Sequence, residues 1–283
     1  MNLTDTVINY LSSPYPIWEC EVTESLVQNK WNELRKEKQL DINDYSTARC
    51  IANSSISNGT KIPLSGISSD EIIYLESPSF DQLGDFYQEH GLAPLFEPEF
   101  KSNQIITKLN KAMAVLALVK PAHSCIAKLV RSVQVLKQED AEIDVSYSHP
   151  QIPFSIFVSV CEDDSDIFNL RVAESILHEA MHLKLTLIEG IVPLVKPFTG
   201  NLYYSPWRDE GRPAQGVLHG LFVFKSILDF YCQIAPNIGF NKVGDYLEFR
   251  KFQIINELNE LKDFFVCQDL TQDGANLSKN LLP

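Results

Sequence analysis

Residues 176–189, with the sequence ILHEAMHLKLTLIE, form the segment around which the rest of the chain has to pack. The segment contains His178, Glu179 and His182 in the pattern HExxH. On an α-helix, residues four apart lie about 40° apart around the axis and roughly one turn along it, so both imidazoles face the same way. One metal ion can then bind both rings, which makes HExxH on a helix a metal-binding pattern.

The metal-motif helix is expected to be buried, because apolar side chains surround it. Leu177 and Met181 lie on one side, and Ala180 and Leu187 lie on the other. A helix that is apolar all round belongs in a protein core. Polar groups buried there need partners, since each unsatisfied one costs about 1–3 kcal/mol. A metal ion would supply that partner for the two histidines.

The composition limits the classes of function. The chain has 283 residues, enough for one large domain or two small ones, and a formal net charge of −13. Binding to nucleic acid needs clustered Lys and Arg, which the sequence lacks. Six scattered cysteines without a CxxC pair indicate reduced, mostly buried thiols. We find no signal peptide and no apolar run as long as a membrane span, so a cytoplasmic protein without a membrane partner is expected.

Hydrophobic periodicity predicts an α+β fold that is mainly helical, with a small sheet beside a metal-binding helix pair. The expected elements are helices over residues 105–120, 126–136, 168–189, 214–234 and 243–265, and two short strands or a hairpin within residues 143–160. Residues 192–213 are expected to form a loop rich in Pro and Gly. We expect an N-terminal region of unknown role over residues 1–100 and a metal-binding catalytic domain over residues 101–283, or one continuous domain.

A third ligand has to complete the metal site, and His219 is the best candidate. It is bracketed by Gly216 and Gly220 in a predicted helix, where each glycine costs about 1 kcal/mol relative to alanine. The two glycines therefore indicate the close approach of a bulky group or of the metal-motif helix. The alternative is a core histidine bonded to a carbonyl group. Glu189 faces the same way as His182 but lies about 10 Å further along the helix, too far to join the pair.

Two arginines precede the His219 helix, in Ser205-Pro-Trp-Arg-Asp-Glu-Gly-Arg-Pro213. Arginine binds planar carboxylates through two parallel hydrogen bonds, so Arg208 and Arg212 could hold a small diacid near the metal. The simpler alternative is that both arginines pair with neighbouring acidic residues at the surface.

HExxH on a buried helix, followed by SPWR and then RPAQGVLHG, resembles the HExxH-motif peptide-modification family. This family is described as 2-oxoglutarate-dependent peptide β-hydroxylases that act on ribosomally synthesised peptides. The resemblance covers about residues 143–230, including the DVSYSHP region.

The resemblance implies an oxidoreductase of the dioxygenase type with Fe(II) and 2-oxoglutarate as cofactors and a ribosomally made precursor peptide as partner. It implies that His178, His182 and His219 hold the iron. Arg208 or Arg212 would bind the distal carboxylate of 2-oxoglutarate. Glu179 would orient a histidine or a water molecule from outside the ligand set.

Two other functions remain open from the residues alone. Three histidines also match a catalytic zinc site, and in a zinc metallopeptidase Glu179 would be the general base. The third possibility is a binding module with a structural metal or none. Structural zinc sites usually close with four protein ligands, often cysteines, and only Cys161 lies near the motif in the sequence.

Overall fold

A computed structural model describes residues 2–13, 17–38, 60–64, 72–78, 80–96, 98–138, 140, 143–161, 165–197, 199–238 and 241–283. The chain forms two compact units, which are described separately. Unit 1 combines Met1–Leu26 with Lys184–Pro283, and unit 2 is Val27–Leu183. Residues 101–283 contribute to both units, and the domain boundary expected at residue 100 stays a prediction. The expected class, a mainly helical α+β fold with a small sheet, is confirmed.

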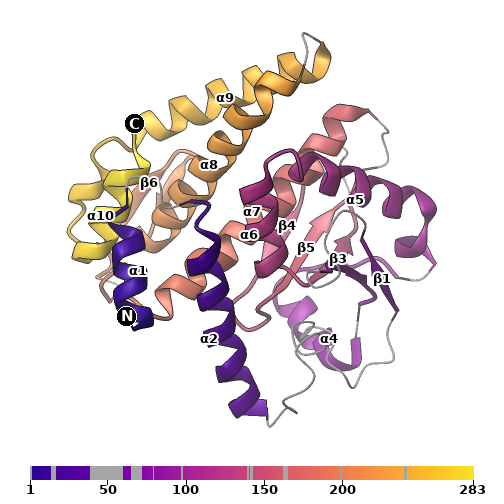
Figure 1. The fold of residues 1–283 in the computed structure, drawn as a ribbon, viewed down its shortest axis with the longest axis horizontal. Helices are drawn as coiled ribbons and strands as arrows, with labels where there is room; N and C mark the ends of the chain where they lie inside the picture. Colours follow the sequence, from indigo (N-terminus) through magenta and orange to yellow (C-terminus); the bar gives the residue numbers. More distant parts are fainter. Residues whose placement is uncertain are drawn as a thin grey trace. The chain divides into compact units, whose positions relative to one another are not determined.

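A five-stranded mixed sheet forms the centre of unit 2 (Figure 1). Its order is β1 (Lys61–Pro63), β2 (Tyr74–Glu76), β3 (Ser132–Leu136), β5 (Ser155–Ser159) and β4 (Ser146–Ser148). Strands β2, β3 and β5 are parallel, whereas β1 and β4 pair antiparallel at the two edges. The pairing of β4 with β5 places Ser146 opposite Val158, which confirms the hairpin expected within residues 143–160.

Helices cover both faces of this sheet (Figure 1). On one face lies α4 (Phe80–Glu89), whose Tyr87 hydroxyl donates to Gln134 Oε1 at 2.7 Å. The other face is covered by α5 (Asn103–Leu116), α6 (Lys120–Leu129) and the first part of α7 (Asp166–Glu189). The helix α2 (Cys20–Lys38) begins in unit 1 and ends in unit 2.

The helix expected over residues 126–136 is wrong in its second half. Helix α6 ends at Leu129, and Ser132–Leu136 form the strand β3. All five residues of β3 are buried, because a parallel strand in the middle of a sheet is covered on both faces. Such a strand shows no alternation of polar and apolar residues, so its apolar positions matched a helical spacing by coincidence.

Unit 1 is built around α8 (Ala214–Ile234), which has the bounds expected from the sequence. The other main elements of this unit are α1 (Leu3–Leu11), β6 (Tyr203–Ser205), β7 (Glu210–Arg212), α9 (Lys242–Glu260) and α10 (Gln272–Leu281). Helix α9 ends five residues before the expected bound. Residues 203–212 form the β6–β7 hairpin rather than an irregular loop, and neither α1 nor α10 was expected.

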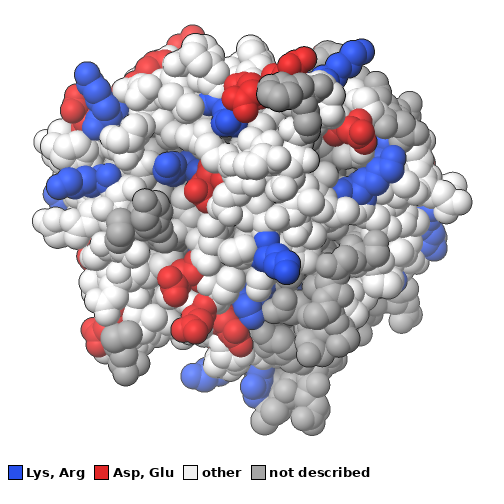
Figure 2. Space-filling view, turned by 45° about the horizontal axis from the view of Figure 1, so that its top comes forward, with Lys and Arg blue, Asp and Glu red and all other residues white. Residues whose placement is uncertain are grey.

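The segment Ala214–Asn237 corrects one expectation from the sequence. By length and composition it is apolar enough to cross a membrane, although no such run was expected. However, 61% of its most apolar stretch is buried inside the structure, as in the core helix of a soluble protein. On the face in Figure 2, Lys and Arg side chains are interspersed with Asp and Glu, without the extended basic surface that nucleic-acid binding requires.

Candidate metal centre

The two histidines of HExxH face each other on α7 in unit 2. Their Nε2 atoms lie 3.1 Å apart, and their ring centroids lie 4.7 Å apart. Ligand nitrogens about 2.1 Å from one metal ion would be roughly 3.0 Å apart at a right angle and roughly 3.4 Å apart at a tetrahedral angle. The observed separation of the Nε2 atoms therefore fits two ligands of a single ion, and imidazole suits both iron and zinc.

Two serines of β4 hold the carboxylate of Glu179. Ser146 Oγ donates to Oε1 and Ser148 Oγ donates to Oε2, each at 2.6 Å. Alternate residues of a strand point to the same face, so both hydroxyls reach α7 together. Glu179 is only 4% exposed, and its Oε1 lies 3.9 Å from His178 Nε2. The carboxylate is thus fixed beside the histidine pair. This role of the serines was not predicted from the sequence, although their spacing of two in a predicted strand was a usable signal.

A second group of ionisable rings lies on the opposite face of β4. The Tyr147 hydroxyl is 2.9 Å from His90 Nδ1, and the His90 and His149 ring centroids are 4.7 Å apart. Burial, followed by the charges of Glu179 and Glu89, raises the pKa of Tyr147. Burial and then the neighbouring His90 lower the pKa of His149, with Glu89 acting in the opposite direction. Both shifts favour the neutral forms of these groups.

His219 lies on α8 in unit 1 and pairs with a carboxylate. Its Nε2 is 3.1 Å from Glu189 Oε2, which also accepts a hydrogen bond from Gln215 Nε2 at 3.0 Å. This contact gives His219 a carboxylate partner, whereas the alternative considered from the sequence was a carbonyl group. Metal-ligating histidines usually bond a carboxylate through one ring nitrogen and the metal through the other. Glu189, rejected as a metal ligand, is instead the hydrogen-bond partner of the candidate ligand His219.

The glycines around His219 accommodate side chains from the β6–β7 hairpin region. A Cβ atom on Gly220 would lie 2.4 Å from Trp207 Cζ3, and one on Gly216 would lie 3.3 Å from the Arg212 guanidinium. Trp207 also stacks on Phe224, with ring centroids 4.9 Å apart. Within unit 1, the bulky group expected at these glycines is thus an indole and a guanidinium.

The two candidate arginines lie at or near the surface of unit 1. Arg208 is exposed, and Arg212 Nε lies 3.9 Å from Glu210 Oε1 with its side chain 40% exposed. The surface pairing considered for Arg212 is therefore present.

Beside Arg208, the Trp207 Nε1–H is buried and has no hydrogen-bond acceptor within the part of the chain that the structure describes. A buried donor in this state points to an acceptor such as a water molecule, an ion or a ligand.

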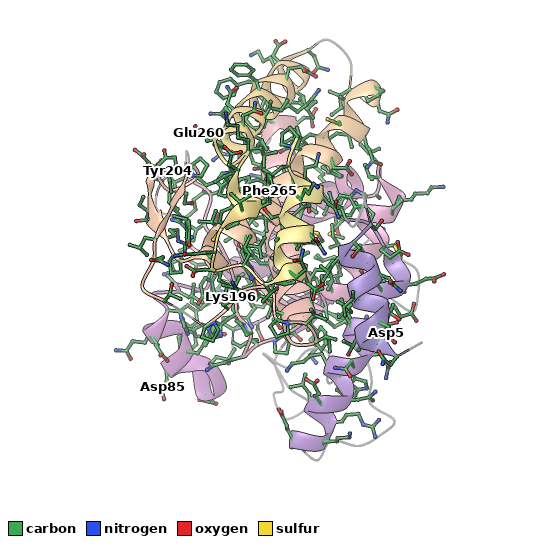
Figure 3. All side chains as sticks on the ribbon, turned by 90° about the vertical axis from the view of Figure 1, so that its left-hand side faces the viewer. Asp5, Asp85, Lys196, Tyr204, Glu260 and Phe265 are labelled. Carbon is green, nitrogen blue, oxygen red and sulfur yellow. The ribbon has the colours of Figure 1, made fainter. Side chains whose placement is uncertain are left out.

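A pocket of about 330 Å³ lies in unit 1 beside Glu189, with Lys196 and Asp269 on its wall. Figure 3 labels Lys196 beside the C-terminal segment, where its Nζ donates to Gln268 O at 2.6 Å. Arg208 and Arg212 are not among the described residues that line this pocket. The pocket therefore does not match the carboxylate clamp expected from the sequence.

Asp269 is the most heavily hydrogen-bonded carboxylate near the pocket. Tyr203 OH donates to Oδ2 at 2.8 Å, Asn201 Nδ2 donates to Oδ2 at 3.2 Å and Thr199 Oγ1 donates to Oδ1 at 3.0 Å. Burial alone would raise the pKa of Asp269, but these hydrogen bonds and the charge of Lys196 lower it below its ordinary value. Asp269 thus fixes the segment before β6 to the segment before α10.

The structure brings His178, His182 and Glu179 together in unit 2, and it places His219, Arg208 and Arg212 in unit 1. Among the described residues, no group of three or more His, Cys, Asp or Glu side chains is arranged to hold a metal ion. Neither a scan against protein-family models nor a search of curated proteins found a match to this chain.

Proposed function

We propose that this chain is an iron(II)- and 2-oxoglutarate-dependent dioxygenase that hydroxylates a β-carbon in a ribosomally synthesised peptide. The observation that supports a metal enzyme most directly is the histidine pair on α7, whose Nε2 atoms are 3.1 Å apart beside a fixed carboxylate. Bound iron would activate molecular oxygen, which would oxidise both the C–H bond and 2-oxoglutarate, the latter to succinate and carbon dioxide. The resemblance of the motifs, rather than the geometry, names the reaction. A cytoplasmic location belongs to the same proposal.

In this proposal His178, His182 and His219 hold the iron. The hydrogen bond between His219 and Glu189 supports this role, because it fixes the orientation of the imidazole ring and its tautomer. Ser146 and Ser148 fix Glu179, which in turn restricts the position of the adjacent His178 ring. Each of these contacts prepares a ligand for the metal.

The distal carboxylate of 2-oxoglutarate would bind Arg208 or Arg212. Trp207 supports a carboxylate site here, because its buried Nε1–H has no acceptor among the described residues. Arg208→Lys or Arg212→Lys at the true clamp should weaken binding of 2-oxoglutarate and leave the fold intact, since lysine lacks the planar pair of donors. Wild-type affinity for 2-oxoglutarate in both variants would show that the clamp lies elsewhere.

The second candidate function is a zinc metallopeptidase. It is favoured by the position of Glu179, because a carboxylate 3.9 Å from His178 Nε2 is close enough to act as a base toward a water molecule at the histidine pair. In this case Glu179→Gln should abolish activity while the metal stays bound. A hydroxylase with the same substitution should keep measurable turnover.

One experiment separates the two functions. The chain is purified without oxygen and its metal content is measured. Oxygen is then admitted, and the conversion of 2-oxoglutarate to succinate is followed with added Fe(II) and with added Zn(II). The proposal expects succinate with iron alone, and a loss of metal binding in His178→Ala, His182→Ala and His219→Ala. Zinc content without succinate would make the peptidase the leading function.

A further inference from the structure

Among the strands that the structure describes, β4 lies at one edge of the sheet in unit 2. Ser159 N donates to Val145 O at 2.7 Å, so the main-chain groups of residue 145 face β5. In an antiparallel pair, successive residues face the neighbouring strand alternately. The main-chain N–H and C=O groups of Ser146 and Ser148 therefore point away from β5. Within the described residues, they form no main-chain hydrogen bond to another segment.

Within its three residues, strand β4 carries no lysine, proline or bulge, which are features that prevent edge strands from pairing, although a short length is another such feature. Strand β4 is Ser-Tyr-Ser and is preceded by Ile143 and Val145, which are 59% and 39% exposed. Asp144 between them is already paired with Arg171, at 2.8 Å between Oδ2 and Nε. The edge therefore offers main-chain donors and acceptors together with apolar side chains.

We propose that β4 binds an extended peptide as an additional strand, and that the peptide carries apolar residues at every second position. This inference rests on the proposed function for the identity of the peptide as substrate. The two faces of the edge differ and so set the pattern. Val145 lies on the same face as Tyr147 and Ile143 is exposed just before it, and the apolar peptide residues would pack against these side chains. The other peptide residues would lie on the face of Ser146 and Ser148.

The second face gives the docking a catalytic consequence. Ser146 and Ser148 bind Glu179, whose Oε1 is 3.9 Å from His178 Nε2. A peptide paired with β4 would therefore direct every second side chain toward the face of the sheet that carries the histidine pair. The residue to be modified would come from this set, and its apolar neighbours would anchor the main chain on both sides.

The test uses a library of fluorescein-labelled linear peptides of about ten residues, roughly two strand lengths. Valine, leucine or isoleucine stands at alternate positions, with serine, lysine or glutamine between them. Binding to the full chain is measured by fluorescence polarisation, and the best peptide is then N-methylated at one amide at a time. We expect a loss of roughly tenfold in affinity at every second amide and little change at the others, because only alternate amides face β4.

Changes in the protein provide the matched control. The double variant Ile143→Ser/Val145→Ser should weaken binding roughly tenfold by removing apolar contact area. Phe252→Ser should leave binding unchanged, because this side chain, which is 64% exposed, belongs to α9 in unit 1. Hydrogen exchange should show new protection of the Ser146 and Ser148 amides when the peptide binds.

Four results would overturn the docking proposal: no peptide in the library binds, N-methylation acts without alternation, the double variant binds normally, or copies of the chain pair through β4 instead. Peptide binding at β4 without succinate formation would keep the docking site and reject the proposed hydroxylase. Succinate formation coupled to a peptide that does not protect Ser146 and Ser148 would do the reverse.

Discussion

The hydrogen bonds from Ser146 and Ser148 to Glu179 predict a measurable loss of stability when either hydroxyl is removed. A hydrogen bond to a charged group contributes about 1.5–3 kcal/mol. Both serines are half-buried, so water can replace part of each interaction, and we expect Ser146→Ala or Ser148→Ala to cost about 1.5 kcal/mol. For a chain of this size, that corresponds to a decrease in Tm of roughly 3–6 °C.

A neighbouring serine provides the control. Ser155 lies on β5, and its buried hydroxyl has no hydrogen-bond partner among the described residues. Ser155→Ala should therefore be neutral or stabilising, because it removes a buried hydroxyl without a partner and leaves a side chain of similar size. In the Glu179→Gln background, Ser148→Ala should cost only about 0.5–1.5 kcal/mol, since the acceptor is uncharged.

Urea unfolding followed by circular dichroism measures all of these free energies under the same conditions. The double-mutant cycle between Ser148→Ala and Glu179→Gln isolates the interaction of the two side chains. Our reasoning would be refuted if Ser146→Ala and Ser148→Ala cost no more than Ser155→Ala, because β4 would then not hold the carboxylate.

Four further substitutions test packing and electrostatics. Gly220→Ala should destabilise the chain, because overpacking against Trp207 typically costs about 1–3 kcal/mol. This cost exceeds the gain of about 1 kcal/mol in helix propensity. Gly216→Ala should be neutral or stabilising in the same urea titration, because the new methyl group meets only the movable end of the Arg212 side chain. The lowered pKa of Asp269 stabilises the folded chain at pH values above the pKa of an aspartate in the unfolded chain, about 3.9. This stabilisation is lost as the pH falls further. In Asp269→Asn, the free energy of unfolding should therefore decrease less at acid pH than in the wild type. Because the pKa of His149 is lowered in the folded chain, this residue is protonated in the unfolded chain at a higher pH than in the folded chain. The free energy of unfolding should therefore decrease below about pH 6.5 in the wild type, and it should decrease less in His149→Gln.

The sequence predicted the elements that have a strong period and clear ends. The metal-motif helix and α8 were found because both are long and apolar, and because Gly190 and Pro213 mark the end of one and the start of the other. Strand β3 was missed because a strand buried on both faces has no period of two. The β6–β7 hairpin was missed because its strands are three residues long and contain no apolar alternation.

For the candidate site, helix geometry predicted the histidine pair and could not predict its surroundings. The spacing of His178 and His182 is local, so their approach follows from the helix alone. The contacts of Glu179 with β4 join residues more than thirty positions apart and depend on the register of the sheet. The pairing of His219 with Glu189 was missed because Glu189 was considered only as a ligand of the metal and never as a partner of another histidine.

The division of unit 1 into two separate pieces of chain affects the order in which the protein can fold. Asn280 Nδ2 donates to Leu11 O at 3.0 Å across 269 positions, and α1 lies beside α10 (Figure 1). During synthesis, α1 emerges long before α10, and its nine residues are too few for a stable isolated helix. Helix α10 can cover it only after the residues up to Leu281 have been made. The docking of α1 is therefore a late step in folding, and nascent chains that stop before residue 272 would expose the apolar side of this helix to chaperones and proteases.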